Sequence, residues 1–348
     1  MEDETDEEDW PVGSGSRGKS DFSLEQMVGQ RLMLGFEGTH LNQDLKRIIR
    51  ELKAGGIILF RPNIQSPDQV SRLCSDVQSY AADCGQPSLF IAVDQEGGVV
   101  ARLKPPFTQF PGNPYLHTRE DAQAFAGVTA AELTIAGINM NMAPVMDVAP
   151  EGVDSIMKDR VFKGDAAMVS ALGSAVIKTL QRKKIMAVAK HFPGIGRTTK
   201  DSHFFLPTLD INLQTLKATD LRPFEAARDA NVAGIMLSHI SYPQLDDTWQ
   251  ASLSPYIAGD LLRKQLGYQG LVLTDDLDMK AIKHDMKTCV RQVLASGIDL
   301  ALICHKGPNI RIAWEEMGRL LDENPLLFDL AGESMDRILQ TKKRYLPV

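Results

Sequence analysis

The chain has 348 residues, of which 43% are hydrophobic and 24% are charged, with a formal net charge of −7. This composition is typical of a globular protein and excludes a wholly disordered, collagen-like or coiled-coil chain. Residues 1–23 carry eight acidic and two basic side chains, so the remaining residues are almost neutral. We therefore predict a disordered acidic tail at 1–23, followed by one folded domain at 24–348.

The N-terminus and the cysteines favour an intracellular protein. The first residues are acidic and then rich in Gly and Ser, whereas a secretory signal starts with basic and then apolar residues. The cysteines, at 74, 84, 289 and 304, show no metal-ligand spacing and are expected to be free thiols. We expect a cytoplasmic monomer, with no nucleic-acid partner and no membrane partner, because no basic excess and no membrane-length apolar run occurs.

Eight short apolar runs, rich in Ile, Val, Leu and Met, recur along the folded part. They lie at 32–36, 56–60, 89–94, 138–145, 185–191, 233–239, 271–276 and 299–304. Continuous apolar runs of this length are typical of strands buried on both faces, as in a parallel sheet.

Segments with helical periodicity separate these runs. They include 41–54, 66–80, 119–137, 165–183 and 253–267. The segment 66–80 begins with Ser66 as a cap and Pro67 in the first turn, and Pro223 predicts a break in a helix over 211–229. Eight alternations of strand and helix predict an α/β fold, a single-domain (β/α)₈ TIM-type barrel. An open doubly wound sheet is the alternative, but no G-x-G-x-x-G follows the first strand.

Polar residues follow the predicted strands at their C-terminal ends, where barrel enzymes place their chemistry. They are Asp94 and Glu96, Asp147 and Arg160, Lys190 and His191, His239, Asp275 and Asp276, and Cys304 and His305. Isolated charges in a barrel mouth are costly to bury unless they pair with opposite charges or take part in function. Polar residues at the end of strand after strand therefore predict an active or binding site. No H-x-H pair, HExxH motif or P-loop is present, and we expect neither a metal nor another cofactor, although Asp94, His191, His203 and Asp275 could converge on an ion.

Four segments in order carry a resemblance to a known family. They read KHFPGIG at 190–196 followed by DSH at 201–203, VDQEGG at 93–98, NMAPVMDV at 141–148 with DRVF at 159–162, and LTDDLDM at 273–279. The chain resembles glycoside hydrolase family 3, in particular the single-domain bacterial β-N-acetylglucosaminidases (NagZ-type β-hexosaminidases), from about residue 25 onward.

The resemblance implies a retaining exo-β-N-acetylglucosaminidase that removes terminal non-reducing N-acetylglucosamine, from peptidoglycan fragments (muropeptides) in cell-wall recycling. Asp275 would be the nucleophile, and His203, oriented by Asp201, the general acid/base. The substrate-binding residues would be Asp94, Arg160, Lys190 and His191. These residue types suit the roles, since a carboxylate can form a glycosyl ester and an imidazole can exchange protons near neutral pH.

Three details qualify the resemblance. The family usually has His where this chain has Ile195. Alternation along a strand cannot choose between Asp275 and Asp276; the family pattern favours Asp275, and we expect Asp276 to cap or support the following helix. No second domain is expected after the eighth strand, so the acid/base should come from the barrel.

Other functions remain open on the sequence alone. Within the family they are a β-glucosidase or an N-acetylglucosaminide phosphorylase. A barrel lyase that uses Lys190 as a Schiff base, or a sugar-binding protein without turnover, would belong to another class.

Overall fold

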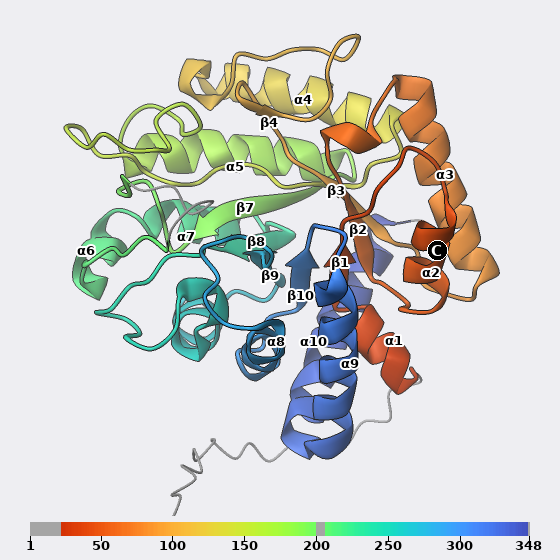
Figure 1. Cartoon of the computed structure of the whole chain (residues 1–348). Coiled ribbons are helices and arrows are strands. Elements are labelled where there is room, and N and C mark those ends of the chain that lie inside the picture. The colour runs from red at the N-terminus through yellow and green to blue at the C-terminus, as the bar shows by residue number, and fades with distance from the viewer. Residues whose placement is uncertain (1–21, 200–205, 347–348) are drawn as a thin grey trace, which may run out of the picture.

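Eight parallel strands pair into a closed ring in the computed structural model of the protein, which describes residues 22–199 and 206–346 (Figure 1). Around the ring the order is β1-β10-β9-β8-β7-β6-β3-β2, so the first and last strands meet. Their bounds are β1 Leu32–Leu34, β2 Gly56–Leu59, β3 Phe90–Val93, β6 Met140–Asn141, β7 Met186–Phe192, β8 Gly234–Leu237, β9 Leu271–Asp276 and β10 Leu300–Ile303. The predicted (β/α)₈ barrel is confirmed, and the open sheet is excluded.

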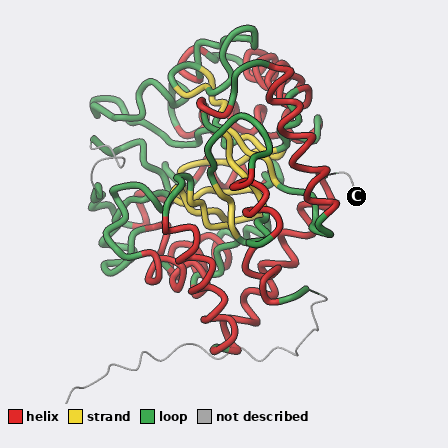
Figure 2. Tube along the Cα trace, turned by 45° about the vertical axis from the view of Figure 1, so that its right-hand side comes forward, coloured by secondary structure: helices red, strands yellow, loops and turns green. Residues whose placement is uncertain are grey.

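Helices surround the strands, which occupy the centre of the molecule in Figure 2. The α-helices are α1 Leu24–Gly29, α2 Gln43–Arg50, α3 Pro67–Asp83, α4 Arg119–Ile135, α5 Ala166–Arg182, α6 Leu213–Ala218, α7 Arg222–Asp229, α8 Met286–Ala295, α9 Pro308–Glu323 and α10 Pro325–Tyr345. The short 3₁₀ helices are η1 Arg61–Asn63, η2 Asn113–Tyr115 and η3 Ala251–Leu253. No described helix combines the length and apolar character needed to cross a membrane.

Local sequence signals explain several helix ends. Ser66 caps α3 by accepting a hydrogen bond from the Gln69 N–H, and Pro67 occupies the first turn, as predicted. The predicted break in 211–229 falls between α6 and α7, and Pro223 lies in the first turn of α7, where its missing N–H costs no hydrogen bond.

Three local features differ from the prediction. The run 138–145 forms a strand only over β6. After it the Ala143 N–H donates back to the Asn141 carbonyl, Pro144 has no N–H to donate, and Val145 makes an isolated parallel bridge to Lys190. The segment expected to be an α-helix at 253–267 forms a π-helix, η4, over Tyr256–Gln265. A hairpin, β4 (Gln95–Gly97) and β5 (Val100–Ala101), follows β3 and was not predicted.

Two apolar layers form the core. The larger layer packs the strands against the surrounding helices, and the smaller one fills the barrel with side chains such as Met33, Met140 and Leu273. The interior layer also contains Tyr345 and Leu346 from the end of α10, beside the first residues of β3 and β9. The end of α10 therefore closes the N-terminal side of the barrel and leaves the C-terminal side for a site. Of the four free cysteines, Cys84 is partly exposed and the others are buried.

The closed side of the barrel contains a buried lysine, Lys342. Lys342 of α10 is buried, its Nζ donates to Gln30 Oε1 over 2.6 Å, and the same Nζ lies 4.9 Å from the centre of the Phe90 ring. Burial lowers the pKa of Lys342 to about 7. The unfolded chain, with an ordinary lysine, therefore binds more protons than the folded chain between about pH 7 and pH 10.

This difference predicts how stability depends on pH. Replacing Lys342 by Met keeps the length of the side chain but removes its charge. As pH rises from about 7 to 10, the free energy of unfolding of the wild type should increase relative to that of Lys342→Met. The slope of this difference should be up to about 1.4 kcal/mol per pH unit. Urea unfolding of both proteins at several pH values measures this difference. The exposed Lys264→Met is the matched control, and parallel curves for wild type and Lys342→Met would contradict the assignment.

Candidate active site

The hairpin after β3 brings two acidic residues to the mouth of the barrel. The Asn141 side chain of β6 accepts from the Gln95 N–H and donates to the Gln95 carbonyl, which ties the start of the hairpin to the next strand. Gly97 and Gly98 form the turn with positive φ angles of 85° and 62°. A Cβ at Gly98 would lie 2.7 Å from the Pro111 carbonyl oxygen, so only glycine fits there. This turn places Glu96 in the mouth beside Asp94.

Lys190 is the centre of the charged cluster in the mouth. Its Nζ lies 2.7 Å from Asp94 Oδ1 and 2.7 Å from Glu96 Oε1, and its side chain is only 3% exposed. Burial opposes the charged form of Lys190, but the two carboxylates outweigh burial and raise its pKa. Burial also opposes the charged form of Asp94 and would raise its pKa, but the positive charges of Lys190 and Arg102 lower that pKa to about 2. The cluster is therefore ionised at neutral pH.

Two arginines complete this cluster. Arg160 donates from Nε and Nη2 to the two carboxylate oxygens of Glu96 over 3.0 and 2.8 Å, a bidentate pair. Arg102, which follows the hairpin, lies 3.3 Å from Asp94 and over the ring of Phe60. Arg102 is not among the predicted site residues, because its position depends on the unpredicted hairpin.

The strand β7 presents two consecutive residues to the mouth. Regular alternation would turn Lys190 and His191 to opposite faces, but the pairing of β7 with β8 shifts between Ala189 and Phe192. The Lys190–His191 peptide within this irregularity is cis.

Asp147 holds His191 in place through its backbone and its ring. Asp147 Oδ2 lies 2.8 Å from His191 Nδ1, and Asp147 Oδ1 accepts the Ile195 N–H over 2.8 Å. Because an ionised carboxylate only accepts, Nδ1 carries the hydrogen and Nε2 is the acceptor, 3.4 Å from Arg160 Nη2. The imidazole is thereby fixed in one tautomer with Nε2 toward the charged cluster.

Asp275 lies where β9 departs from regular pairing. Leu273 pairs with Leu300 of β10, but the next pair is Asp276 with Leu302, so β9 contains one extra residue. Such a bulge changes the direction of a side chain. The Asp275 carboxylate accepts the Asp276 N–H over 2.8 Å. Burial would raise the pKa of Asp275, but the neighbouring His239 and His191 side chains, the Asp276 N–H and the Lys190 ammonium together outweigh burial and lower it, so the carboxylate is ionised.

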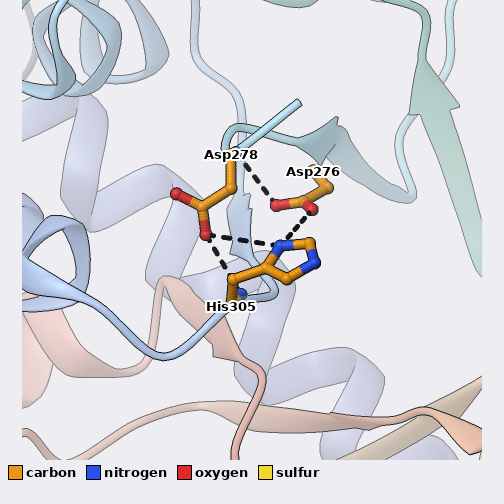
Figure 3. Close-up of side chains that lie close together, drawn as sticks. All are labelled: Asp276, Asp278 and His305. Carbon is orange, nitrogen blue, oxygen red and sulfur yellow. Dashed lines mark hydrogen bonds and ion pairs between the residues drawn. The ribbon is translucent and has the colours of Figure 1, made fainter. Parts of the chain in front are cut away.

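Asp276 binds the N–H that follows the neighbouring strand β10. Of the two roles expected for it, capping or supporting the following helix, the first is wrong. Its Oδ1 accepts the N–H groups of Asp278 and Cys304, and its Oδ2 lies 3.2 Å from His305 Nδ1 (Figure 3). The residue that caps α8 is Asp285. Asp276, Asp278 and His305 are close enough to hold a metal ion, but these hydrogen bonds and ion pairs already explain why they meet.

The predicted acid/base pair, Asp201 and His203, lies outside the described residues. The chain before them is firmly held. Arg197 Nε donates to both carboxylate oxygens of Asp220, and the Tyr242 hydroxyl donates to the Gly194 carbonyl.

The geometry argues against the lyase alternative. A Schiff base forms from a neutral amine, whereas Lys190 is held in its charged form by two carboxylates at 2.7 Å.

The contacts of Glu96 predict its effect on stability. The change Glu96→Gln keeps the shape but leaves Lys190 and Arg160 with one carboxylate fewer in a buried site. We expect the free energy of unfolding at pH 7 to fall by about 3 kcal/mol, measured by urea unfolding. The control is Glu315→Gln, which removes an exposed ion pair with Arg311 and should leave stability near that of the wild type. Equal effects of both changes would contradict the role of Glu96.

Comparisons with known proteins agree with one another. The profile of the Glycosyl hydrolase family 3 N terminal domain matches residues 23–340. A β-hexosaminidase from Alkalilimnicola ehrlichii is 34% identical over 79% of this chain and 80% of its own. The solved family 3 β-N-acetylglucosaminidase from a Paenibacillus species superposes with a TM-score of 0.89 at 34% identity, over 93% of this chain and 63% of that one. NagZ from Neisseria gonorrhoeae, solved with N-trifluoroacetyl-D-glucosamine, gives a TM-score of 0.72 at 27% identity, over 87% and 98% of the two chains.

Proposed function

Because the chain belongs to glycoside hydrolase family 3, we propose that it removes terminal β-linked N-acetylglucosamine from the non-reducing end of its substrates. By homology it is a β-hexosaminidase. The observation that carries the proposal is the carboxylate of Asp275, on the bulge at the end of β9, in a barrel mouth where Lys190 pairs with Asp94 and Glu96. A retaining glycosidase needs such a nucleophile beside groups that hold the sugar.

The proposed reaction has two steps. Asp275 attacks the anomeric carbon while His203 gives its proton to the departing oxygen, so that a glycosyl ester forms and the glycosidic bond breaks. His203 then takes a proton from water, the water oxygen attacks the same carbon, and the ester bond to Asp275 breaks. Asp201 keeps the imidazole of His203 oriented. The roles of Asp201 and His203 rest on the family resemblance of the DSH segment.

The charged cluster suits the recognition of a neutral sugar. Asp94, Arg160, Lys190 and His191 present charged groups and an imidazole acceptor that can bind hydroxyl groups in fixed directions. We further propose that the natural substrates are muropeptides and that the reaction serves cell-wall recycling in the cytoplasm. This part of the proposal rests on the resemblance to NagZ-type enzymes.

A substrate panel tests the proposed function. Aryl β-N-acetylglucosaminide and aryl β-glucoside are compared, each with and without phosphate, and sugar release from muropeptides is followed by mass spectrometry. We expect kcat/KM to be at least about 100-fold higher for the N-acetylglucosaminide, with no sugar phosphate formed. Preference for the glucoside would support the β-glucosidase alternative, and phosphate-dependent formation of a sugar 1-phosphate would support the phosphorylase. Absence of turnover on every substrate would contradict the proposal.

The role of His203 makes a separate prediction. His203→Ala should slow hydrolysis of substrates with poor leaving groups by about 100-fold or more, because those leaving groups need the proton. Aryl substrates with activated leaving groups should be cleaved at nearly the wild-type rate in the first step, measured as a burst of released phenol. Equal losses on both kinds of substrate would contradict an acid role. Thr215→Ala, on α6, is a control remote from the mouth.

A further inference from the structure

The nucleophile segment, residues 274–276 at the end of β9, contains the proposed nucleophile Asp275. Side chains hold this segment at the point where the regular backbone pairing of β9 with its neighbouring strands ends. Thr274 is the last residue of β9 in regular register with β8, opposite Leu237. On the β10 side the Thr274 hydroxyl accepts the Leu302 N–H over 3.0 Å. On the β8 side His239 Nε2 lies 2.8 Å from the Asp276 carbonyl oxygen. Asp275 therefore lies between Thr274 and Asp276, and at each of these two residues a side chain makes a hydrogen bond that a backbone group makes in a regular strand pair.

A chain of hydrogen bonds defines the tautomer of His239. A carbonyl oxygen can only accept, so the hydrogen is on Nε2, and Nδ1 accepts from the Ser252 hydroxyl over 2.7 Å. The Ser252 oxygen in turn accepts from Gln250 Nε2 over 3.3 Å. Every member donates in the same direction, toward the peptide that follows Asp275.

These three polar side chains are all buried. His239, Ser252 and Gln250 are 1%, 0% and 4% exposed. Burial lowers the pKa of His239 more than the nearby Asp275 and Asp276 raise it, so the ring stays neutral with one donor and one acceptor. Burying polar groups costs free energy unless each is hydrogen-bonded. Here the hydrogen bonds form one chain, from Gln250 through Ser252 and His239 to the Asp276 carbonyl.

We propose that His239 is a positioning residue for the nucleophile. By donating to the Asp276 carbonyl it fixes the residue whose N–H binds Asp275 Oδ1, and it thereby orients the Asp275 carboxylate for attack on the sugar. Ser252 acts through His239 by fixing its tautomer. This inference rests on the proposed function, in which Asp275 is the nucleophile.

The test measures formation of the covalent bond directly. Asp275 attacks the anomeric carbon of a 5-fluoro-N-acetylglucosaminyl fluoride, the bond from that carbon to fluorine breaks, and fluoride ion departs. The slowly hydrolysed glycosyl ester that remains on Asp275 is detected by intact-protein mass spectrometry. The rate of attachment of the sugar to Asp275 is compared for wild type, His239→Leu, His239→Gln, Ser252→Ala and Ser296→Ala. The dissociation constant of a competing N-acetylglucosamine analogue is measured in parallel, and Asp275→Asn is the unlabelled control.

We expect His239→Leu to slow attachment by about 10- to 100-fold, because a misplaced reacting group loses rate steeply. The dissociation constant should change by less than about threefold, since the sugar-binding residues are untouched. His239→Gln should recover most of the rate, because its amide N–H can replace Nε2–H. A purely structural role would change binding and attachment together, or would change thermal stability alone.

Ser252→Ala keeps the test informative if His239→Leu fails to fold. Ser252→Ala should slow attachment several-fold, whereas Ser296→Ala should not, although Ser296 is also a buried serine that contacts η3, through the Leu253 carbonyl. Attachment at the wild-type rate in the His239 variants, or equal rates for the two serine variants, would overturn the inference. Failure of the wild type to be labelled at Asp275 would instead overturn the proposed function, so the two failures are distinguishable.

Discussion

The neutralisation of Lys190 by Asp94 and Glu96 is the interaction on which the mouth of the barrel depends. An ammonium group that is 3% exposed stays charged only if carboxylates compensate for the water it has lost. The three residues come from β7, the end of β3 and β4, and Arg160 joins them through Glu96 from the loop after β6. One electrostatic requirement therefore fixes the positions of several chain segments that are distant in sequence.

The sequence predicted the barrel and most of the side chains in its mouth, because apolar runs that end in polar residues follow directly from the physics of a buried parallel strand. It could not predict the exceptions to regular alternation. Lys190 and His191 both reach the mouth at a shifted register, Asp275 is on a bulge, and the hairpin that positions Glu96 and Arg102 depends on tertiary contacts. These irregularities coincide with the candidate active site, and functional sites are where a structure is expected to depart from local sequence rules.

The departure of this chain from the family pattern at Ile195 leaves the support of His191 intact. Asp147 binds the backbone N–H at position 195, so this contact does not depend on the side chain that the position carries. Ile195 is buried and packs in the layer between barrel and helices. The same carboxylate fixes the tautomer of His191, so the support of the imidazole is retained despite the substitution.

The pairing of β1 with β10, together with the closure of the barrel floor by the end of α10, has a consequence for synthesis on the ribosome. A chain that emerges at about 5–20 residues per second cannot pair β1 with β10 until residue 303 has left the exit tunnel, and it cannot cover the barrel floor until residue 345 has followed. Apolar strand edges stay uncovered until then, for roughly tens of seconds. Chaperone binding during translation should therefore matter more for this protein than for one built from contacts between neighbouring segments.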